Sequence, residues 1–370
     1  MTVDQIYTLV NAAASQAFGS SVLQVNDAQS LVALGNTVLS STTNTELFLN
    51  TLIQRVGRTI YSFRAYRNKF ADYYKSDMEY GAIVQKVKAK MATAEADESY
   101  GLTNGVAVDM YKVRKPEVEQ KLFVKETPYQ IAVTIQRTLL KRAFLSPAGV
   151  EELISIIFGE IQNSIEFNNE NLGKVTLCNL IAEQADTART INLITNYKAA
   201  SGDSTITAQT ALFDEAFLRY ATAQINLYSD YLTDMRTEFN DDGYERHTPK
   251  EDQFLRVITQ FENALESQML YGAYNEGYVK LPEFKQISFW QSSTSPFAIQ
   301  VKRASDGEET ALNNVVAVLH DRDACGVYSV EEDVLTTPVN AAGRYYNTFW
   351  HLRNLWFNDL SENCVVFTLN

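Results

Sequence analysis

Apolar residues recur every three or four positions from residue 147 onward, which predicts a long amphipathic helix. Ser146 fits the N-cap, Pro147 the first helical position, and Glu151 and Glu152 the first turn. The apolar stripe consists of Val150, Leu153, Ile154, Ile157, Ile161 and Ile165, and apolar residues at 172, 175 and 181 extend it. Polar residues at 163, 166, 169 and 170 occupy the opposite face, so this helix is expected on the surface of a core.

Two further helices are expected in the middle of the chain. The first covers about residues 210–236, where Leu212, Ala216, Tyr220, Ala223 and Leu227 share one face. The second begins at a capping box, Thr248-Pro249-Lys250-Glu251, and continues at helical spacing to Met269. Its early part, QFLRVIT, is rich in β-branched residues, so a strand that leads into a shorter helix is the alternative.

Alternation of apolar and polar residues, typical of strands, appears in residues 78–90 and 110–124. The stretch between them contains Gly101 and Asn104-Gly105, so the two runs predict an extended hairpin with a turn-rich tip. Pro116 fits an edge strand. The hairpin has too little apolar surface for a core of its own and must lie against something else. From residue 287 onward, the runs ISFWQ, FAIQVK, NVVAVLH, YYNTFW and CVVFTL predict strands.

Charge is distributed unevenly along the chain. Residues 1–54 contain no lysine or arginine, and their small and polar side chains predict an extended arm with one or two short helices. Residues 55–125 hold fourteen basic and nine acidic residues, whereas residues 143–370 hold fifteen basic and thirty-two acidic ones. A basic segment is thus joined to an acidic body, which indicates a partner surface. The alternative is a solvated hairpin that basic residues merely decorate.

The overall composition is that of a globular protein, with 370 residues of which 45% are hydrophobic and 21% charged. The net charge of -13 argues against bulk attraction to nucleic acid or to a membrane surface. Cys178, Cys325 and Cys364 fit neither a disulfide framework nor a zinc pattern and suit a reducing compartment. Because the chain lacks a long apolar stretch and a basic N-terminal start, a soluble protein made in a cytoplasm is expected.

Catalytic motifs give little support to an enzyme. The sequence contains no phosphate-binding loop, dinucleotide fingerprint, nucleophile elbow or zinc-protease motif. The sharpest candidate is His320-Asp321-Arg322-Asp323 after an apolar strand, which fits a divalent metal or a proton relay. The hydrogen bonds and ion pairs of an ordinary turn explain the same residues more simply, so no catalytic residue, metal site or cofactor is assigned.

Aromatic residues cluster near Tyr61–Tyr80 and again in residues 345–357. The second cluster, with Trp350 and nearby Trp356, suits a carbohydrate platform or a nucleobase stacking surface, although a sheet face with interface contacts is the favoured interpretation. Arg64 and Arg67 alternate with aromatic residues in the first cluster. That pattern fits stacking on single-stranded nucleic acid or anchoring at an oligomer interface.

The order of these elements resembles the major capsid proteins of tailed phages with the Hong Kong 97-like fold. The stretches ERHTPKEDQFLRV, AVLHDRDACGVYSV and RYYNTFWHLRNLWFNDLSENCVVFTL are similar to capsid proteins of phages that infect low-GC Gram-positive bacteria. The resemblance implies an α+β fold with an N-terminal arm (1–60), an extended hairpin loop and flanks (61–130), a peripheral domain with a long spine helix (131–190), a mainly axial domain (191–340) and C-terminal strands that return to the peripheral domain (341–370).

The resemblance also implies a function. Copies of the chain would form pentamers and hexamers of an icosahedral phage head around double-stranded DNA, in the virion and, during assembly, in the host cytoplasm. A separate scaffolding protein and a portal would be partners, contact with packaged DNA would be weak and non-specific, and no membrane or cofactor would be involved. The basic hairpin would lie over the acidic body of the next subunit, with interface candidates Arg64, Arg67, Lys86, Lys88, Lys90, Arg114 and Lys115. The alternative function is a carbohydrate- or host-binding virion module that uses the C-terminal aromatic cluster.

Overall fold

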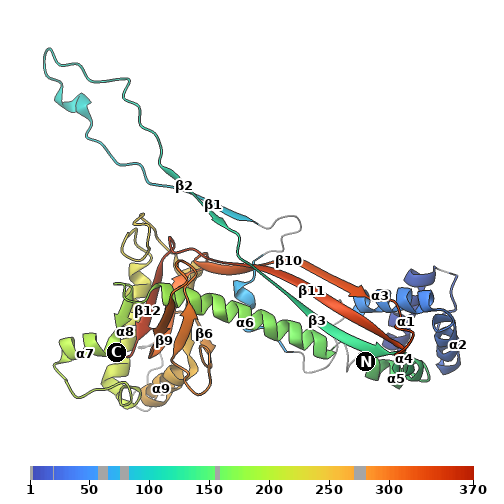
Figure 1. The fold of residues 1–370 in the computed structure, drawn as a ribbon. Coiled ribbons are helices and arrows are strands. Elements are labelled where there is room, and N and C mark those ends of the chain that lie inside the picture. Colours follow the sequence, from blue (N-terminus) through green and yellow to red (C-terminus); the bar gives the residue numbers. More distant parts are fainter. Residues whose placement is uncertain (1–2, 20, 57–65, 76–82, 155–158, 271–280) are drawn as a thin grey trace. The chain divides into compact units, whose positions relative to one another are not determined.

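The computed structural model describes residues 3–19, 21–56, 66–75, 83–154, 159–270 and 281–370 (Figure 1). The chain divides into two compact units, and each unit combines three separate stretches of sequence. The first unit comprises residues 1–82, 125–173 and 327–355, and the second comprises residues 83–124, 174–326 and 356–370. The chain therefore passes from one unit to the other five times.

The N-terminal part of the first unit is helical. It forms α1 (Val3–Phe18), α2 (Ala28–Val38) and α3 (Thr42–Val56), so the predicted extended arm with one or two short helices is wrong for the described residues. The buried face of α1 consists of Ile6, Leu9, Val10, Ala13 and Ala14. This spacing is helical, but the many Ala, Ser and Thr residues around it weaken the contrast between apolar and polar faces.

A three-stranded sheet packs in the core of the first unit with these helices and with α4 (Arg137–Ala143) and α5 (Pro147–Leu153). The strand order is β10 (Cys325–Thr336), β11 (Tyr345–Asn358), β3 (Glu126–Gln136). The central strand β11 runs antiparallel to β3, with Tyr345 opposite Gln136 and Leu355 opposite Glu126. Buried side chains that share this core include Phe48, Ile135, Phe144, Tyr346 and Trp350.

The long helix predicted from the apolar stripe is present as α6 (Glu160–Glu183), a helix of 24 residues. The predicted start at Pro147 is also present, but it belongs to the separate short helix α5, where Ser146 Oγ accepts a hydrogen bond from the Gly149 N–H at 3.2 Å. Residues 155–158 of the predicted stripe lie outside the described residues.

A strap, residues 66–75, lies along the first half of α6 in the first unit. Glu170 accepts hydrogen bonds from the Tyr66 hydroxyl (2.6 Å) and the Lys69 N–H (3.2 Å), and it is only 6% exposed. Asn163 Oδ1 accepts one from the Tyr66 N–H at 2.9 Å. The expectation that this polar face lies at the surface is therefore wrong around Glu170, because its side chains satisfy donors of the strap.

The second unit is built on a five-stranded mixed sheet in the order β4 (Thr190–Asn192), β12 (Cys364–Thr368), β9 (Val315–Asp321), β5 (Gln253–Ile258), β6 (Phe284–Ile287). The inner strands β12 and β9 are antiparallel to each other, and every residue in both is buried. This explains their continuous apolar sequences, which are typical of strands covered on both faces. The outer strands β4 and β6 run parallel to their neighbours.

Helices and a small hairpin complete the second unit: α7 (Leu193–Ser201), α8 (Glu215–Tyr231), α9 (Thr259–Leu270), β7 (Ile299–Lys302) and β8 (Glu309–Leu312). The helix predicted near residues 210–236 is confirmed as α8. The helix predicted from Thr248 is wrong in its first half, where a short 3-10 turn, Lys250–Asp252, leads into strand β5 and then into α9. The alternative of a strand followed by a shorter helix is confirmed.

Candidate subunit interface

The predicted hairpin is present in the second unit, with shorter strands than expected. Strands β1 (Val84–Ala89) and β2 (Val118–Phe123) pair antiparallel, so residues 110–117 are not part of a strand, and residues 78–82 lie outside the described residues. Between the two strands lies one 3-10 turn, Glu98–Gly101. We name residues 89–118 the finger; every residue in it is exposed.

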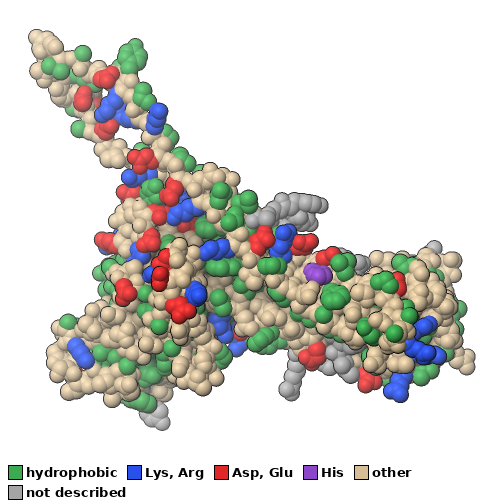
Figure 2. All heavy atoms as spheres, in the orientation of Figure 1, with side chains coloured by type: hydrophobic (Ala, Val, Ile, Leu, Met, Phe, Trp, Pro, Cys, Tyr) green, Lys and Arg blue, Asp and Glu red, His purple; other side chains and the backbone are tan. Residues whose placement is uncertain are grey.

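The finger carries large apolar side chains that the rest of the second unit does not cover. Tyr100 is 91% exposed, Tyr111 81% and Met110 78%. Leu102, Val106 and Val113 are exposed as well. Figure 2 shows apolar, acidic and basic side chains intermingled along the extended hairpin. Exposed apolar side chains on a segment without a core are typical of a surface that another molecule covers.

Three lysines at the base of the hairpin meet carboxylates of the same chain. Lys86 Nζ lies 2.6 Å from Asp359 Oδ2 and 2.7 Å from Glu362 Oε1. Lys88 Nζ lies 2.8 Å from the same Asp359 oxygen. Lys121 Nζ lies 3.7 Å from Asp359 Oδ1 and pairs more closely with Asp242, at 2.6 Å. We name these six residues the base cluster.

The base cluster is buried at its centre. Asp359 is 1% exposed and Lys88 6%. Burial alone would raise the pKa of Asp359, but Lys86 and Lys88 outweigh it and hold that pKa well below its ordinary value of 3.8. Burial dominates at Lys88 and lowers its pKa, whereas Asp359 and Glu362 outweigh burial at Lys86 and raise its pKa. The pKa shifts show that Asp359 is ionised in the folded chain at neutral pH.

Charge along the finger differs from the sequence expectation. Residues 89–118 carry four basic and five acidic side chains, so the exposed part of the hairpin is close to neutral. Lys90 pairs with Glu117 at 3.2 Å, and Glu95 pairs with both Lys112 and Arg114, which lower the pKa of Glu95 to about 2. The expected basic surface is therefore absent from the described finger, because its acidic residues balance its basic ones. The lysines of β1 and β2, at the base, pair with acidic residues of the same chain.

The residues predicted for an interface have different surroundings. Lys86 and Lys88 pair within the chain, so a role between subunits stays a prediction for them. Lys90, Arg114 and Lys115 lie in the finger and are exposed. Arg67 is an exposed residue of the strap, and Arg64 lies outside the described residues. Sequence reasoning missed Asp359, Glu362 and Asp242, although acidic residues directly after the strand pattern of residues 345–357 were a visible signal.

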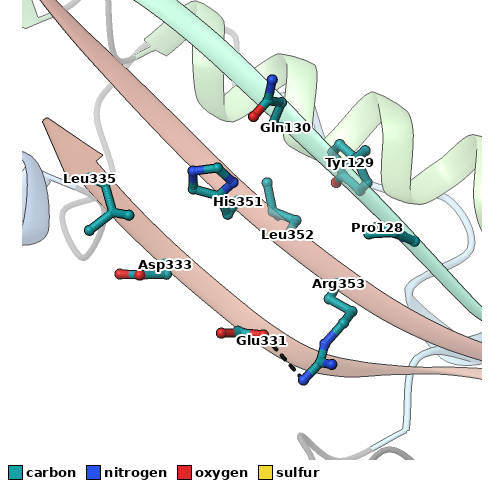
Figure 3. A pocket seen from close by; sticks show the side chains of 9 residues that line it. All are labelled: Pro128, Tyr129, Gln130, Glu331, Asp333, Leu335, His351, Leu352 and Arg353. Atoms are coloured by element: carbon teal, nitrogen blue, oxygen red, sulfur yellow. Dashed lines mark ion pairs between the residues drawn. The ribbon is translucent and has the colours of Figure 1, made fainter. Parts of the chain in front are cut away.

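A groove of about 510 Å³ lies on one face of the three-stranded sheet in the first unit (Figure 3). Three strands line it: β10 with Glu331, Asp333 and Leu335, β11 with His351, Leu352 and Arg353, and β3 with Pro128, Tyr129 and Gln130. Arg353 pairs with Glu331 at 3.2 Å. The lining mixes both signs of charge with aliphatic surface.

The aromatic residues of β11 do not form an exposed platform. Trp350 is 5% exposed, and Tyr346 is fully buried in the core of the first unit. Along β11 these two residues occupy even-numbered positions, whereas His351 and Arg353 occupy odd-numbered ones, so the two pairs lie on opposite faces of the sheet. The observed placement agrees with the interpretation of the cluster as a sheet face, and a carbohydrate-binding role is not favoured.

The His320 segment forms the end of β9 and the turn that follows it. His320 is fully buried, and its Nδ1 lies 2.8 Å from the backbone oxygen of Asp321. The Asp321 carboxylate accepts hydrogen bonds from Thr248 Oγ1 (2.7 Å) and the Asp323 N–H (2.8 Å), as in an ordinary turn. Over the described part of the chain, no group of three or more His, Cys, Asp or Glu side chains is placed to hold a metal ion. Within the same residues, no helix is long and apolar enough to cross a membrane.

Comparison with known proteins decides the family. Residues 8–368 match the model of the Phi29-like phage major capsid proteins. The chain belongs to this capsid protein family. The major capsid protein of Bacillus phage B103 is 22% identical, in a match that covers 99% of this chain and 73% of that protein. The major capsid protein of Streptococcus phage Cp-1 is also 22% identical, and the match covers 62% of this chain and 60% of that protein.

The solved structures agree with this family at the level of fold. A chain in the capsid structure of Staphylococcus phage Andhra superimposes with a TM-score of 0.52 at 10% identity, over 84% of this chain and 87% of that one. The capsid protein family is a class of structural proteins, not of enzymes.

Proposed function

We propose that copies of this capsid protein associate into pentamers and hexamers, which close into an icosahedral head around double-stranded DNA. The observation that carries the proposal is the finger, where a long run of exposed residues presents Tyr100, Met110 and Tyr111 to solvent. Such a surface is unfavourable in an isolated chain and suits contact with a second copy. Large aromatic side chains supply much of the binding energy at protein interfaces.

The domain organisation forms part of the proposal. We infer a Hong Kong 97-like arrangement in which residues 1–60 are the N-terminal arm, folded as helices rather than extended, and α6 is the spine helix of a peripheral domain at residues 131–190. Residues 191–340 would then form most of an axial domain. Of residues 341–370, only β11 would return to the peripheral domain, because β12 lies in the five-stranded sheet between β4 and β9. The order of elements and the fold shared with the Andhra capsid chain support this division.

The contact between copies is heterologous in this proposal, with the finger of one copy on the body of the next, so that repetition closes a ring. Because the finger is nearly neutral, apolar contact contributes more than charge complementarity. Lys90, Arg114 and Lys115 lie at its polar rim. A separate scaffolding protein, a portal and assembly in the host cytoplasm complete the proposal. Contact with the packaged DNA is weak, since the chain carries a net charge of -13.

The proposal is tested by replacing the two most exposed tyrosines together, Tyr100→Ser and Tyr111→Ser. The wild-type chain, alone or with a scaffolding protein, should form shells visible by electron microscopy. The double variant should form at least tenfold fewer, because aromatic anchors typically contribute about 2–4 kcal/mol each. Its melting temperature should stay within about 3 °C of the wild type, as both side chains are exposed.

Phe213→Ser is the matched control, since Phe213 is a highly exposed aromatic residue of the second unit outside the hairpin. It should assemble like the wild type. A wild-type chain that stays monomeric under all assembly conditions, or a double variant with normal shell yield, would contradict the proposal.

A further inference from the structure

One carboxylate contacts both strands of the hairpin. Lys86 and Lys88 are two positions apart on β1 and therefore lie on the same face. Lys121 of β2 lies directly opposite Lys86 in the strand register. The ammonium groups of all three lysines lie within 3.7 Å of Asp359. The contacts with Asp359 therefore constrain the directions of both β1 and β2.

Asp359 is itself held firmly by the body of the second unit. Its backbone N–H donates to the Ala324 oxygen at 2.7 Å, and its Oδ1 accepts a hydrogen bond from the Ser361 N–H at 3.1 Å. Beside it, the rings of Phe123 and Phe357 pack with centroids 5.2 Å apart. The anchor is therefore buried and hydrogen-bonded to the body of the second unit, unlike the exposed Lys90–Glu117 pair farther along the hairpin.

Small rotations at this base become large displacements at the finger tip. About fourteen residues separate the base from the tip, which corresponds to a reach of up to about 45 Å at ~3.3 Å per residue. A rotation of about 10° at the base moves such a tip by about 8 Å, which is more than the ~4.8 Å spacing of two strands. A contact that depends on the finger therefore needs a fixed base, and a preorganised segment loses less entropy on binding.

We infer that Asp359 is a positioning residue for assembly: through Lys86, Lys88 and Lys121 it fixes the direction in which the hairpin leaves the second unit. This inference rests on the proposed function, because the finger is placed for contact with a second copy. Asp359 does not take part in that contact itself. Its partners at the hairpin and at the body set where the finger points.

The experiment uses the full chain with spin labels on cysteines introduced at residues 104 and 213, two exposed positions of the second unit. Pulsed electron resonance measures the distribution of distances between the labels. Asp359→Asn keeps the size and shape of the side chain at residue 359 but removes the negative charge that pairs with Lys88 in this buried site. Asp306→Asn is the control, since it removes a carboxylate from an exposed pair with Arg303 away from the hairpin.

For Asp359→Asn we expect a distance distribution at least twice as broad as that of the wild type and at least tenfold fewer shells. Hydrogen exchange of β9 and β12 should not change. Lys88→Met should have a smaller effect on the distance distribution and on the shell yield, because Lys86 and Lys121 still contact Asp359. Asp306→Asn should match the wild type.

The inference is overturned if Asp359→Asn leaves the distribution narrow, or broadens it while shells form normally. It is equally overturned if β9 and β12 lose protection together with the hairpin, since Asp359 would then stabilise the whole unit. Failure of the proposed function gives a different result, namely that the wild-type chain itself forms no shells.

Discussion

Glu170 and Asp359 illustrate how buried carboxylates hold separate segments of this capsid protein together. Glu170 binds the strap in the first unit, with hydrogen bonds from one hydroxyl and one backbone amide. Asp359 binds two strands in the second unit through ammonium groups. In both sites the carboxylate is largely removed from water and contacts donors or cations of a separate segment, and such contacts offset the cost of burying its charge.

The depressed pKa of Asp359 makes its contribution to stability depend on pH. In the unfolded chain this group titrates near 3.8, and in the folded chain well below that value. Its contribution is therefore complete above about pH 5 and is lost as the pH falls below the unfolded value towards the folded one. Asp359→Asn should lower the free energy of local opening at the base of the hairpin by about 3 kcal/mol at pH 7, without a comparable loss in the core strands β9 and β12.

Hydrogen exchange of the β1 and β2 amides, in the wild type and in Asp359→Asn across pH 7 to 3, checks this expectation after correction for the intrinsic exchange rate at each pH. The difference between the two proteins should shrink as the pH falls below 4. Other carboxylates titrate in both proteins and cancel in the difference. A difference that stays constant over the whole range would contradict the assignment.

The lysines of the candidate site could be recognised from the sequence, whereas their partners could not. Alternation in β1 places Lys86 and Lys88 on one face, and that much follows from strand geometry alone. Their partner Asp359 lies more than 270 residues farther along the chain. Only the tertiary fold brings these residues together, so local patterns led to the expectation of a partner in another subunit.

At the level of elements, burial decides between helix and strand where periodicity is ambiguous. Residues 253–258 follow helical spacing, yet they form β5 because five of its six side chains are buried. A strand between two other strands can bury both faces, whereas an amphipathic helix leaves one face in water. The N-terminal helices show the reverse case. Their many small and polar residues hid the helical spacing in the sequence, but α1 packs against α3 and α5, and this packing stabilises it as a helix.

Gly173 of α6 allows the strap to approach the helix closely. A Cβ atom at this position would lie 2.9 Å from the Cβ of Phe70, a buried residue of the strap. Gly173→Ala should therefore destabilise the protein by about 1–3 kcal/mol through overpacking. Helix propensity alone predicts the opposite sign, a gain of about 1 kcal/mol. Urea unfolding distinguishes the two outcomes.

Gly159→Ala serves as the comparison, because a Cβ at Gly159 meets no atom within 4 Å. It should be neutral or slightly stabilising. If the two substitutions change the free energy of unfolding equally, contact with Phe70 does not restrict the size of the side chain at residue 173.

For the whole molecule, exposure of the finger predicts that trypsin cleaves free chains faster than assembled ones. Trypsin should cut the free chain rapidly after Lys90, Lys112 and Arg114, which all lie in the exposed finger, and not after Lys115, which precedes Pro116. If neighbouring copies cover the finger in shells, cleavage at these sites should slow by at least tenfold. Mass spectrometry of timed digests measures both rates, and equal rates at Arg114 would contradict coverage of the finger.

Both units depend on strands that the ribosome makes after residue 344. The inner strand of the three-stranded sheet, β11, and an inner strand of the five-stranded sheet, β12, both come from the last 26 residues, as does Asp359. A ribosome that stalls before residue 345 thus releases a product in which neither sheet is closed. In such a product β3 and β10 lack the strand that joins them and β9 lacks its pairing with β12, so neither unit can complete its sheet.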